Sequence, residues 1–365
     1  MANVLNVYFN AELAGTLRDE KGRLYFRYAP AWLRSPNLVA LSIPLPPSTD
    51  EYGDDVVRPF FENLLPEGEI RSAIAHIKHV SEKNTFGLLE EIGGDCAGAI
   101  SLLLPESAPP ATGDYNRLSD EQLHEMLHSL EKRPLITTDN NEIRLSLAGA
   151  QHKLPVMLKD GAFFLGRGNA PSSHILKPNI AGFANTTANE MFCMTLADKA
   201  GLPVPKASLH RQPETVYLVA RYDRVKVGER LTRLHQIDFC QALNFPSSKK
   251  YEKEGGPSLT DCFAILRHYC REPAKDVQNL ISWTVFNYLI GNSDAHGKNL
   301  SLLMIPAGVA LAPFYDLLCT AVYTGLTHNL AFKIGGENRP AKAELDFVEG
   351  LEDYLAAQIA LDRNP

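Results

Sequence analysis

Several features of membrane, secreted and nucleic-acid-binding proteins are missing from this sequence. No apolar run approaches the length that spans a bilayer, and the first residues, MANVLNVYFNAELAG, lack the basic start, apolar stretch and cleavage site of a signal peptide. The six cysteines lie far apart without a CxxC pair, which disfavours a zinc ribbon or a disulfide framework. Acidic residues (43) outnumber basic residues (36), so nucleic-acid binding by bulk positive charge is not expected. We therefore expect a cytoplasmic protein with reduced thiols and no membrane contact.

The composition that remains is that of an ordinary globular protein. Of the 365 residues, 45% are hydrophobic and 22% are charged, which suffices for two domains or one two-lobed unit. Strand patterns dominate the start, a segment rich in Pro, Ser and Gly is typical of a linker, and helical periodicity dominates beyond about residue 230. We predict an α+β protein with a β-rich region at 1–103, a linker at 104–118, a lobe with strands at 119–228 and an all-helical lobe at 229–365.

The segment NYLIGNSDAHGKNLSLL, residues 287–303, sets several polar side chains directly behind an apolar helix pattern. Asp294 and Asn299 are five positions apart, the interval between the catalytic base and the metal-binding asparagine of protein kinases. In that arrangement a carboxylate takes the proton of the attacking hydroxyl while an amide oxygen holds Mg²⁺ on the transferring phosphate. Lys298 could offset charge on the γ-phosphate, and Asp316, in LAPFYDLL, is expected to supply a second oxygen ligand for the metal.

Further upstream, three features follow the order of the parts of a kinase. Lys177 lies in a predicted strand, HILKP, and Glu190 lies thirteen residues later in the first turns of a predicted helix, the layout of the kinase lysine and its glutamate partner. Before them, SLAGAQHK sets Ala148, Gly149 and Ala150 in a turn whose backbone amides could approach phosphate oxygens. Each feature alone is weak, but their order and spacing together favour a kinase.

Seven segments together resemble one known family. They are SLAGAQHK, HILKP, the NE pair at 189–190, RYDR, LHQIDFCQALNFPSSKKYEKEGGP, GNSDAHGKN and PFYDL, and they run from about residue 142 to 320. This combination is similar to the HipA-like serine/threonine kinase toxins of bacterial toxin–antitoxin systems, and FFENLLPEG and GDCAGAISLL extend the resemblance into 1–103. The resemblance implies a two-lobed protein-kinase-like fold that uses ATP and Mg²⁺ and carries an extra N-terminal subdomain.

The resemblance also implies roles for residues of this sequence. Asp294 would be the catalytic base with Lys298 beside it, Asn299 and Asp316 would hold the metal, and Ser146 would be an autophosphorylation site. A phosphate on Ser146 would repel the nucleotide phosphates and switch the kinase off. The residues expected around ATP are Ala148, Gly149, Ala150, Gln151, His152, Lys153, Lys177, Glu190, Ala220, Arg221, Tyr222, His296 and Tyr315.

Partners and targets follow from the same resemblance. It implies that a small HipB-like helix-turn-helix antitoxin holds this chain, and that the chain reaches operator DNA only through that antitoxin. It also implies a translation-related target such as an aminoacyl-tRNA synthetase, whose phosphorylation arrests growth and leads to persistence. The sequence departs from the family pattern in two places: it ends at Pro365, earlier than the best-known relatives, and it has Ala220 where an acidic side chain is expected at the adenine hinge.

Three alternatives stay open at this point. HEMLH at residues 124–128 has the HExxH pattern of zinc proteases, with His124 and His128 on one helix face and Glu125 as a base, although no following segment offers an evident third ligand at a familiar spacing. DAHGKN also resembles the catalytic loop of phosphatidylinositol kinases, but no polybasic membrane-binding stretch accompanies it. A non-catalytic repressor subunit is the third, and it would need none of the kinase residues described above.

Overall fold

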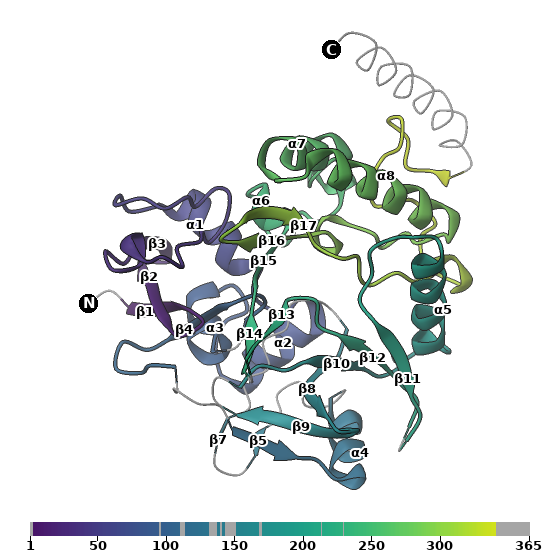
Figure 1. Ribbon diagram of the computed structural model, residues 1–365, viewed down its shortest axis with the longest axis horizontal. Coiled ribbons are helices and arrows are strands. Elements are labelled where there is room, and N and C mark those ends of the chain that lie inside the picture. Colours follow the sequence, from purple (N-terminus) through teal and green to yellow (C-terminus); the bar gives the residue numbers. More distant parts are fainter. Residues whose placement is uncertain are drawn as a thin grey trace.

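The computed structural model describes residues 3–94, 96–109, 114–130, 137–138, 141–142, 151–167, 170–212, 214–228 and 230–340. Within these ranges the chain forms an N-terminal subdomain, an N-terminal lobe built on a six-stranded sheet and a C-terminal lobe (Figure 1). Ser146 and the predicted turn at Ala148, Gly149 and Ala150 lie outside the described residues, as does the chain end at Pro365.

The N-terminal subdomain is an antiparallel sheet with short helices beside it. In strand β1, buried Leu5 and Val7 alternate with more exposed neighbours, the two-residue period of a strand with one face on a core. The strands, in the spatial order β3-β2-β1-β4, are β1 (Asn3–Phe9), β2 (Glu12–Glu20), β3 (Arg23–Tyr28) and β4 (Ile100–Leu103). The helices are the 3₁₀-helix η1 (Trp32–Arg34), α1 (Asp54–Glu62), α2 (Gly68–Ile77) and α3 (Thr85–Ile92).

The N-terminal lobe contains the six-stranded sheet, in the order β11-β12-β10-β8-β9-β5. Asp160 and Gly161 both have positive φ angles (50° and 75°) and form a tight turn between β8 and β9. The strands of this sheet are β5 (Asp114–Arg117), β8 (Leu154–Lys159), β9 (Ala162–Arg167), β10 (His174–Lys177), β11 (Ala207–His210) and β12 (Val216–Ala220). The other elements are α4 (Asp120–Ser129), β6 (Thr137–Thr138), β7 (Asn141–Glu142), α5 (Thr186–Lys199), β13 (Arg224–Val227) and β14 (Arg230–Arg233).

Two elements at the start of this lobe show how sequence and packing combine. Helix α4 begins with a capping box, in which Ser119 and Gln122 satisfy each other's backbone amides, and its leucines pack on the sheet. Residues 114–117, by contrast, belong to the predicted linker but form edge strand β5, which pairs with β9. The composition of this segment favours a linker, and only the open edge of β9 makes it a strand.

The C-terminal lobe is not all-helical as expected, because it also contains the antiparallel sheet β15-β16-β17. The short segments SLLMI and GVAL pair around a tight connection, a pattern that helical periodicity in the neighbouring sequence obscures. The elements of this lobe are β15 (His235–Asp238), α6 (Phe239–Ala242), η2 (Glu252–Glu254), α7 (Leu259–Tyr269), α8 (Pro273–Leu289), η3 (Gly297–Asn299), β16 (Ser301–Ile305), β17 (Gly308–Leu311) and η4 (Thr320–Val322).

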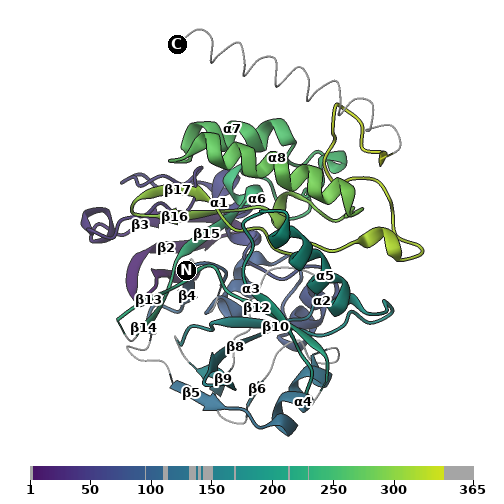
Figure 2. The ribbon, with the colours of Figure 1, turned by 45° about the vertical axis from the view of Figure 1, so that its right-hand side comes forward.

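The N-terminal subdomain packs on the C-terminal lobe, beside β15 and α6 (Figures 1 and 2). The side chain of Gln241 on α6 donates a hydrogen bond of 2.9 Å to the carbonyl of Phe60, and Ser42 donates one of 2.9 Å to the carbonyl of Gln241. Apolar side chains of both units belong to one core cluster, whereas α4 and one face of the six-stranded sheet form another. The subdomain and the C-terminal lobe therefore share one hydrophobic core.

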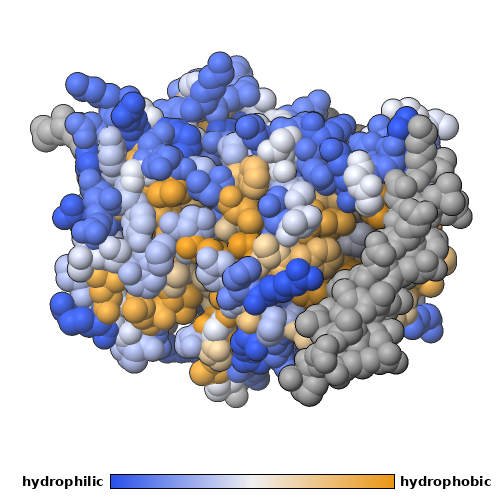
Figure 3. Space-filling view, turned by 90° about the horizontal axis from the view of Figure 1, so that it is seen from above, coloured by the Kyte–Doolittle hydropathy of each residue, from blue (hydrophilic) through white to orange (hydrophobic). Residues whose placement is uncertain are grey.

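The outer surface over α7 and α8 is mainly polar, with apolar patches between the polar side chains (Figure 3). Leu289 at the end of α8 is one exposed apolar side chain of this lobe. Among the described helices, none has the length and apolar character needed to cross a membrane.

Candidate active site

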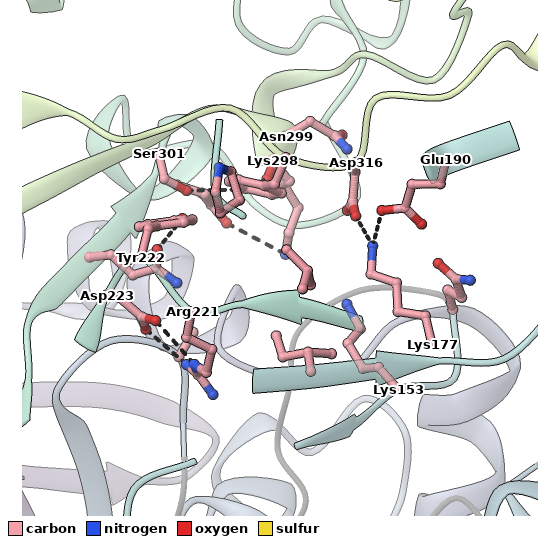
Figure 4. A pocket seen from close by; sticks show the side chains of 18 of the residues that line it. Lys153, Lys177, Glu190, Arg221, Tyr222, Asp223, Lys298, Asn299, Ser301 and Asp316 are labelled. Carbon is pink, nitrogen blue, oxygen red and sulfur yellow. Dashed lines mark hydrogen bonds and ion pairs between the residues drawn. The ribbon is translucent and has the colours of Figure 1, made fainter. Parts of the chain in front are cut away.

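A pocket of about 390 Å³ lies between the lobes, and residues from all three units line it (Figure 4). The N-terminal subdomain contributes Asn63 and Glu67, which sequence analysis did not single out. The predicted site residues that line the pocket are Gln151, Lys153, Lys177, Glu190, Ala220, Arg221, Tyr222, Asp294, His296, Lys298, Asn299, Tyr315 and Asp316. His152 is described but does not line this pocket.

Lys177 joins the two lobes at the centre of the pocket. It lies at the end of β10, where it pairs with Tyr217 of β12, and its side chain is only 6% exposed. The Nζ atom donates a hydrogen bond of 2.7 Å to Oε1 of Glu190 on α5 and another to Oδ1 of Asp316 in the C-terminal lobe (Figure 4). Burial disfavours the ammonium charge, but the two carboxylates outweigh this effect and raise the pKa of Lys177. Lys177 is therefore a buried cation with one carboxylate from each lobe.

Asp294 follows α8, where the chain leaves the helix and turns towards the pocket. Its backbone amide donates to the side chain of Asn292 at 3.1 Å, and its own side chain is 54% exposed. The hydroxyl of Tyr251 donates a hydrogen bond to Oδ1 of Asp294, and Nε2 of His296 lies 3.8 Å from the same oxygen. Burial lowers the pKa of His296 to about 4, so that ring is neutral at neutral pH. The exposed carboxylate can thus meet an incoming hydroxyl group.

Asn299 and Asp316 supply oxygen atoms at the upper side of the pocket in Figure 4. Oδ1 of Asn299 is buried and accepts no hydrogen bond from the described residues. Asp316 has a φ angle of 54°, a left-handed conformation that is uncommon for aspartate. Burial raises the pKa of Asp316, but Lys177 and Lys153 outweigh that effect and lower it. A charged carboxylate and an amide oxygen without a donor fit the hard oxygen ligands that Mg²⁺ prefers.

Lys298 is held by the N-terminal subdomain and is buried. Its Nζ atom lies 2.8 Å from Oε1 of Glu67 and donates a hydrogen bond of 2.9 Å to Oδ1 of Asn63. Oδ2 of Asp238 lies 3.7 Å away. Burial disfavours the charge of Lys298, but Asp238 and Glu67 outweigh it and raise the pKa of this lysine. Lys298, which the sequence predicts to offset charge on the γ-phosphate, therefore also lies close to two carboxylates of the protein.

The predicted hinge segment, residues 220–222, lies at the other side of the pocket from Lys177 (Figure 4). Arg221 does not extend into solvent, because its guanidinium group makes two hydrogen bonds, of 3.0 and 2.8 Å, to Asp223. The rings of Tyr222 and Tyr315 stack with centroids 5.8 Å apart. The hydroxyl of Tyr315 also donates a 2.8 Å hydrogen bond to the carbonyl of Lys298, which connects this aromatic pair to the catalytic segment.

The end of the predicted phosphate loop also lies at the pocket. The side chain of Gln151 donates a hydrogen bond of 3.3 Å to the carbonyl of Pro178, just after β10. Lys153 precedes β8 and lies near Lys177 in Figure 4. Burial lowers the pKa of Lys153, although Asp316 acts in the opposite direction. Two lysines and one neighbouring carboxylate thus face the same part of the pocket.

Two family models match this chain. One, described as a HipA-like C-terminal domain, matches residues 145–363, and the other, described as a HipA N-terminal domain, matches residues 5–103. The chain belongs to the HipA family. In this HipA-family chain, one model matches the N-terminal subdomain and the other matches most of the two kinase-like lobes.

Individual relatives agree with this assignment. The serine/threonine-protein kinase toxin HipA of Shewanella oneidensis is 33% identical over 328 residues, which cover 86% of this chain and 74% of that protein. A protein of Sinorhizobium fredii described as a candidate kinase, Y4mE, is 41% identical over 353 residues, 94% of this chain and 83% of that protein. A similar solved structure is the complex of the S. oneidensis toxin–antitoxin system, with HipA, HipB and operator DNA. The match has a TM-score of 0.80 and 30% sequence identity, and it covers 95% of this chain and 84% of that chain.

The comparisons confirm the predicted α+β, two-lobed kinase-like fold and the predicted kinase activity of this HipA-family chain. Nucleotide- and metal-dependent phosphoryl transfer is the general chemistry of such enzymes. Sequence reasoning missed Tyr251, Asn63 and Glu67. All three lie in segments that carried the family resemblance, YEKEGGP and FFENLLPEG, but no spacing rule of ordinary kinases points to them.

Proposed function

We propose that this chain is an ATP- and Mg²⁺-dependent serine/threonine protein kinase that acts in the cytoplasm as the toxin of a toxin–antitoxin pair. The observation that carries the proposal is the buried Lys177 between Glu190 and Asp316. In kinases, a lysine held by a helix-borne glutamate binds the phosphates of the nucleotide. Asp294, a half-exposed carboxylate on the same pocket, is the proposed catalytic base.

The two ends of the pocket are proposed to bind different parts of the nucleotide. Lys177 and Lys153 would contact its phosphates, while the backbone of 220–222 and the stacked rings of Tyr222 and Tyr315 would border adenine and ribose. The buried Oδ1 of Asn299, together with the carboxylate of Asp316, would hold Mg²⁺, which when bound neutralises charge on the phosphates. Lys177 would retain Glu190 as its partner if the carboxylate of Asp316 bound the metal.

The proposed transfer step requires one proton acceptor. The bond between the γ-phosphorus and the bridging oxygen of ATP breaks, a new bond to the serine or threonine oxygen forms, and the hydroxyl proton moves to Oδ of Asp294. The hydrogen bond from Tyr251 orients that carboxylate. His296 is neutral beside it and adds no positive charge that would weaken the base. The exposure of Asp294 suits a hydroxyl on a protein surface.

The toxin role rests on the relatives. The S. oneidensis protein was solved with HipB and operator DNA, which supports a HipB-like helix-turn-helix antitoxin as a partner here and DNA contact through it. The net charge of -7 agrees with a chain that leaves phosphate contacts to its antitoxin. The proposed target is a translation-related protein such as an aminoacyl-tRNA synthetase, and autophosphorylation of Ser146 is the proposed off switch.

Controlled expression in bacterial cells tests this function. Wild type is expected to stop growth and to add phosphate to serine or threonine of at least one translation protein, whereas Asp294→Asn does neither. Ser146→Ala is expected to prolong the arrest, and co-expressed antitoxin to relieve it. Arrest by Asp294→Asn equal to that of wild type would overturn the kinase toxin. ATP binding without phosphorylation of any protein would favour the lipid kinase or the repressor subunit instead.

A further inference from the structure

Two histidines on α4 lie apart from the kinase pocket. His124 and His128 are one helical turn apart, and their rings meet edge to face with centroids 4.3 Å apart. The neighbouring side chains Leu123 and Leu127 are buried against the six-stranded sheet, which fixes how α4 is rotated. The two imidazoles therefore lie side by side on the exposed side of α4.

A carboxylate from another part of the chain faces this pair. Glu214 lies just before β12, and Figures 1 and 2 both show α4 beside the connection between β11 and β12. Its Oε1 atom lies 3.7 Å from Nδ1 of His124 and 4.0 Å from Nε2 of His128. One ligand atom from each of the three side chains lies within 4.8 Å of the other two. The third ligand that the sequence did not reveal is therefore supplied by the fold.

The three side chains lie close together, but Glu214 and the two histidines are not hydrogen-bonded. Distances of 3.7 and 4.0 Å exceed the limit of a hydrogen bond. Zinc bonds of about 2.0 to 2.1 Å at the tetrahedral angle place two donor atoms about 3.3 Å apart, so small side-chain adjustments would close this set around one ion. Oε1 of Glu214 is also buried and accepts no hydrogen bond from the described residues. A buried oxygen without a donor costs free energy that a cation would recover.

We propose that His124, His128 and Glu214 form a binding site for one Zn²⁺ ion or a similar first-row divalent cation. Two imidazoles and one carboxylate are typical zinc ligands, and they disfavour Mg²⁺ and Ca²⁺, which take oxygen donors. Three protein ligands leave a fourth position for water or an outside ligand. The site shares no residue with the kinase pocket and needs no nucleotide.

A bound ion would tie α4 to the connection that leads into β12. β12 pairs with β10 and continues into the predicted hinge at 220–222, so the site supports one side of the N-terminal lobe. Because the three ligands converge only in the folded chain, the metal binds the folded state and stabilises it. A surface pair of histidines with a chance glutamate neighbour would show no such stabilisation.

Titration of the full-length, metal-free protein with Co²⁺ and Zn²⁺ tests the site. Wild type is expected to bind one ion per chain, with visible absorption of Co²⁺ that Zn²⁺ removes, and Zn²⁺ is expected to raise its melting temperature. His128→Asn and Glu214→Gln should each weaken Zn²⁺ binding by roughly tenfold or more. His76→Asn, an exposed helical histidine on α2 that belongs to no such group among the described residues, is the matched control and should bind like wild type.

The outcomes separate this site from other sources of binding. Zn²⁺ affinity that is unchanged in both His128→Asn and Glu214→Gln would overturn the proposal, as would the absence of Zn²⁺ binding by wild type. A cobalt–thiolate charge-transfer band would also overturn it, because it would assign the ion to cysteine. Melting curves in the absence of metal show whether each variant is folded, and the two ligands are tested on separate elements so that one misfolded variant does not decide the result.

Discussion

Replacing Glu67 with glutamine tests how the N-terminal subdomain supports the pocket. Glu67 binds two lysines of the C-terminal lobe, Lys298 and Lys250, each with a separation of 2.8 Å. Burial raises the pKa of Glu67, but the two lysines outweigh burial and lower it from 4.5 to about 2. At roughly 1.4 kcal/mol per pKa unit, this shift contributes about 3 kcal/mol of stability at neutral pH.

Glutamine keeps the shape of Glu67 and resembles its protonated form. Glu67→Gln is therefore expected to lower the free energy of unfolding by about 3 kcal/mol at neutral pH. The folded-state pKa is depressed, so the contribution is complete above about pH 4.5 and is lost as the pH falls towards 2. The difference between wild type and variant should shrink over the same range.

Urea unfolding followed by tryptophan fluorescence measures this difference. Trp32 lies in the subdomain and Trp283 in the C-terminal lobe, and both are buried, so the signal reports on both sides of the interface. Glu69→Gln, an exposed carboxylate on α2, is the control and should change stability by less than about 0.5 kcal/mol. A Glu67→Gln variant as stable as the control at neutral pH would exclude this contribution of the Glu67 ion pairs, and so would a difference that persists undiminished in acid.

Three further predictions concern the pocket. Tyr251→Phe removes the hydroxyl that orients Asp294, so kcat is expected to fall about tenfold with little change in the Kd for ATP. A large loss of ATP binding would contradict that role. Lys177→Met removes the buried cation and should lower kcat/KM by about a hundredfold or more, and a variant with near-normal phosphoryl transfer would exclude Lys177 from the phosphate site. Asn299→Ala removes a proposed metal ligand and should raise the Mg²⁺ concentration needed for half-maximal activity by roughly tenfold or more. An unchanged Mg²⁺ dependence would assign the metal to other residues.

Some elements of the fold follow from local signals in the sequence. The capping box at Ser119 begins α4, and the pair Asp160 and Gly161 turns β8 into β9, because both signals act over a few residues. The linker prediction failed at β5, since that segment becomes a strand only through the edge of β9. The all-helical prediction failed at β15 to β17, where short strands lie between longer helices.

The candidate sites show the same difference between what the order of the sequence indicates and what only the folded chain brings together. Kinase spacing and order grouped Lys177, Glu190 and Asp294 correctly around one pocket, because the order of the parts is a property of the chain. Glu67 and Glu214 could not be found in this way. Each meets its partners only after segments far apart in the sequence have packed together, and neither has a spacing that general chemistry would recognise.

The proposed activity of this pocket is phosphoryl transfer with Asp294 as the base. Intact mass of the purified protein after incubation with ATP and Mg²⁺ tests it most directly, with wild type and Asp294→Asn compared and any added phosphate located. Wild type is expected to gain the mass of a phosphate, at Ser146, whereas Asp294→Asn is expected to bind ATP but gain none. Equal phosphorylation of both proteins, or no gain by wild type although ATP is bound, would contradict it.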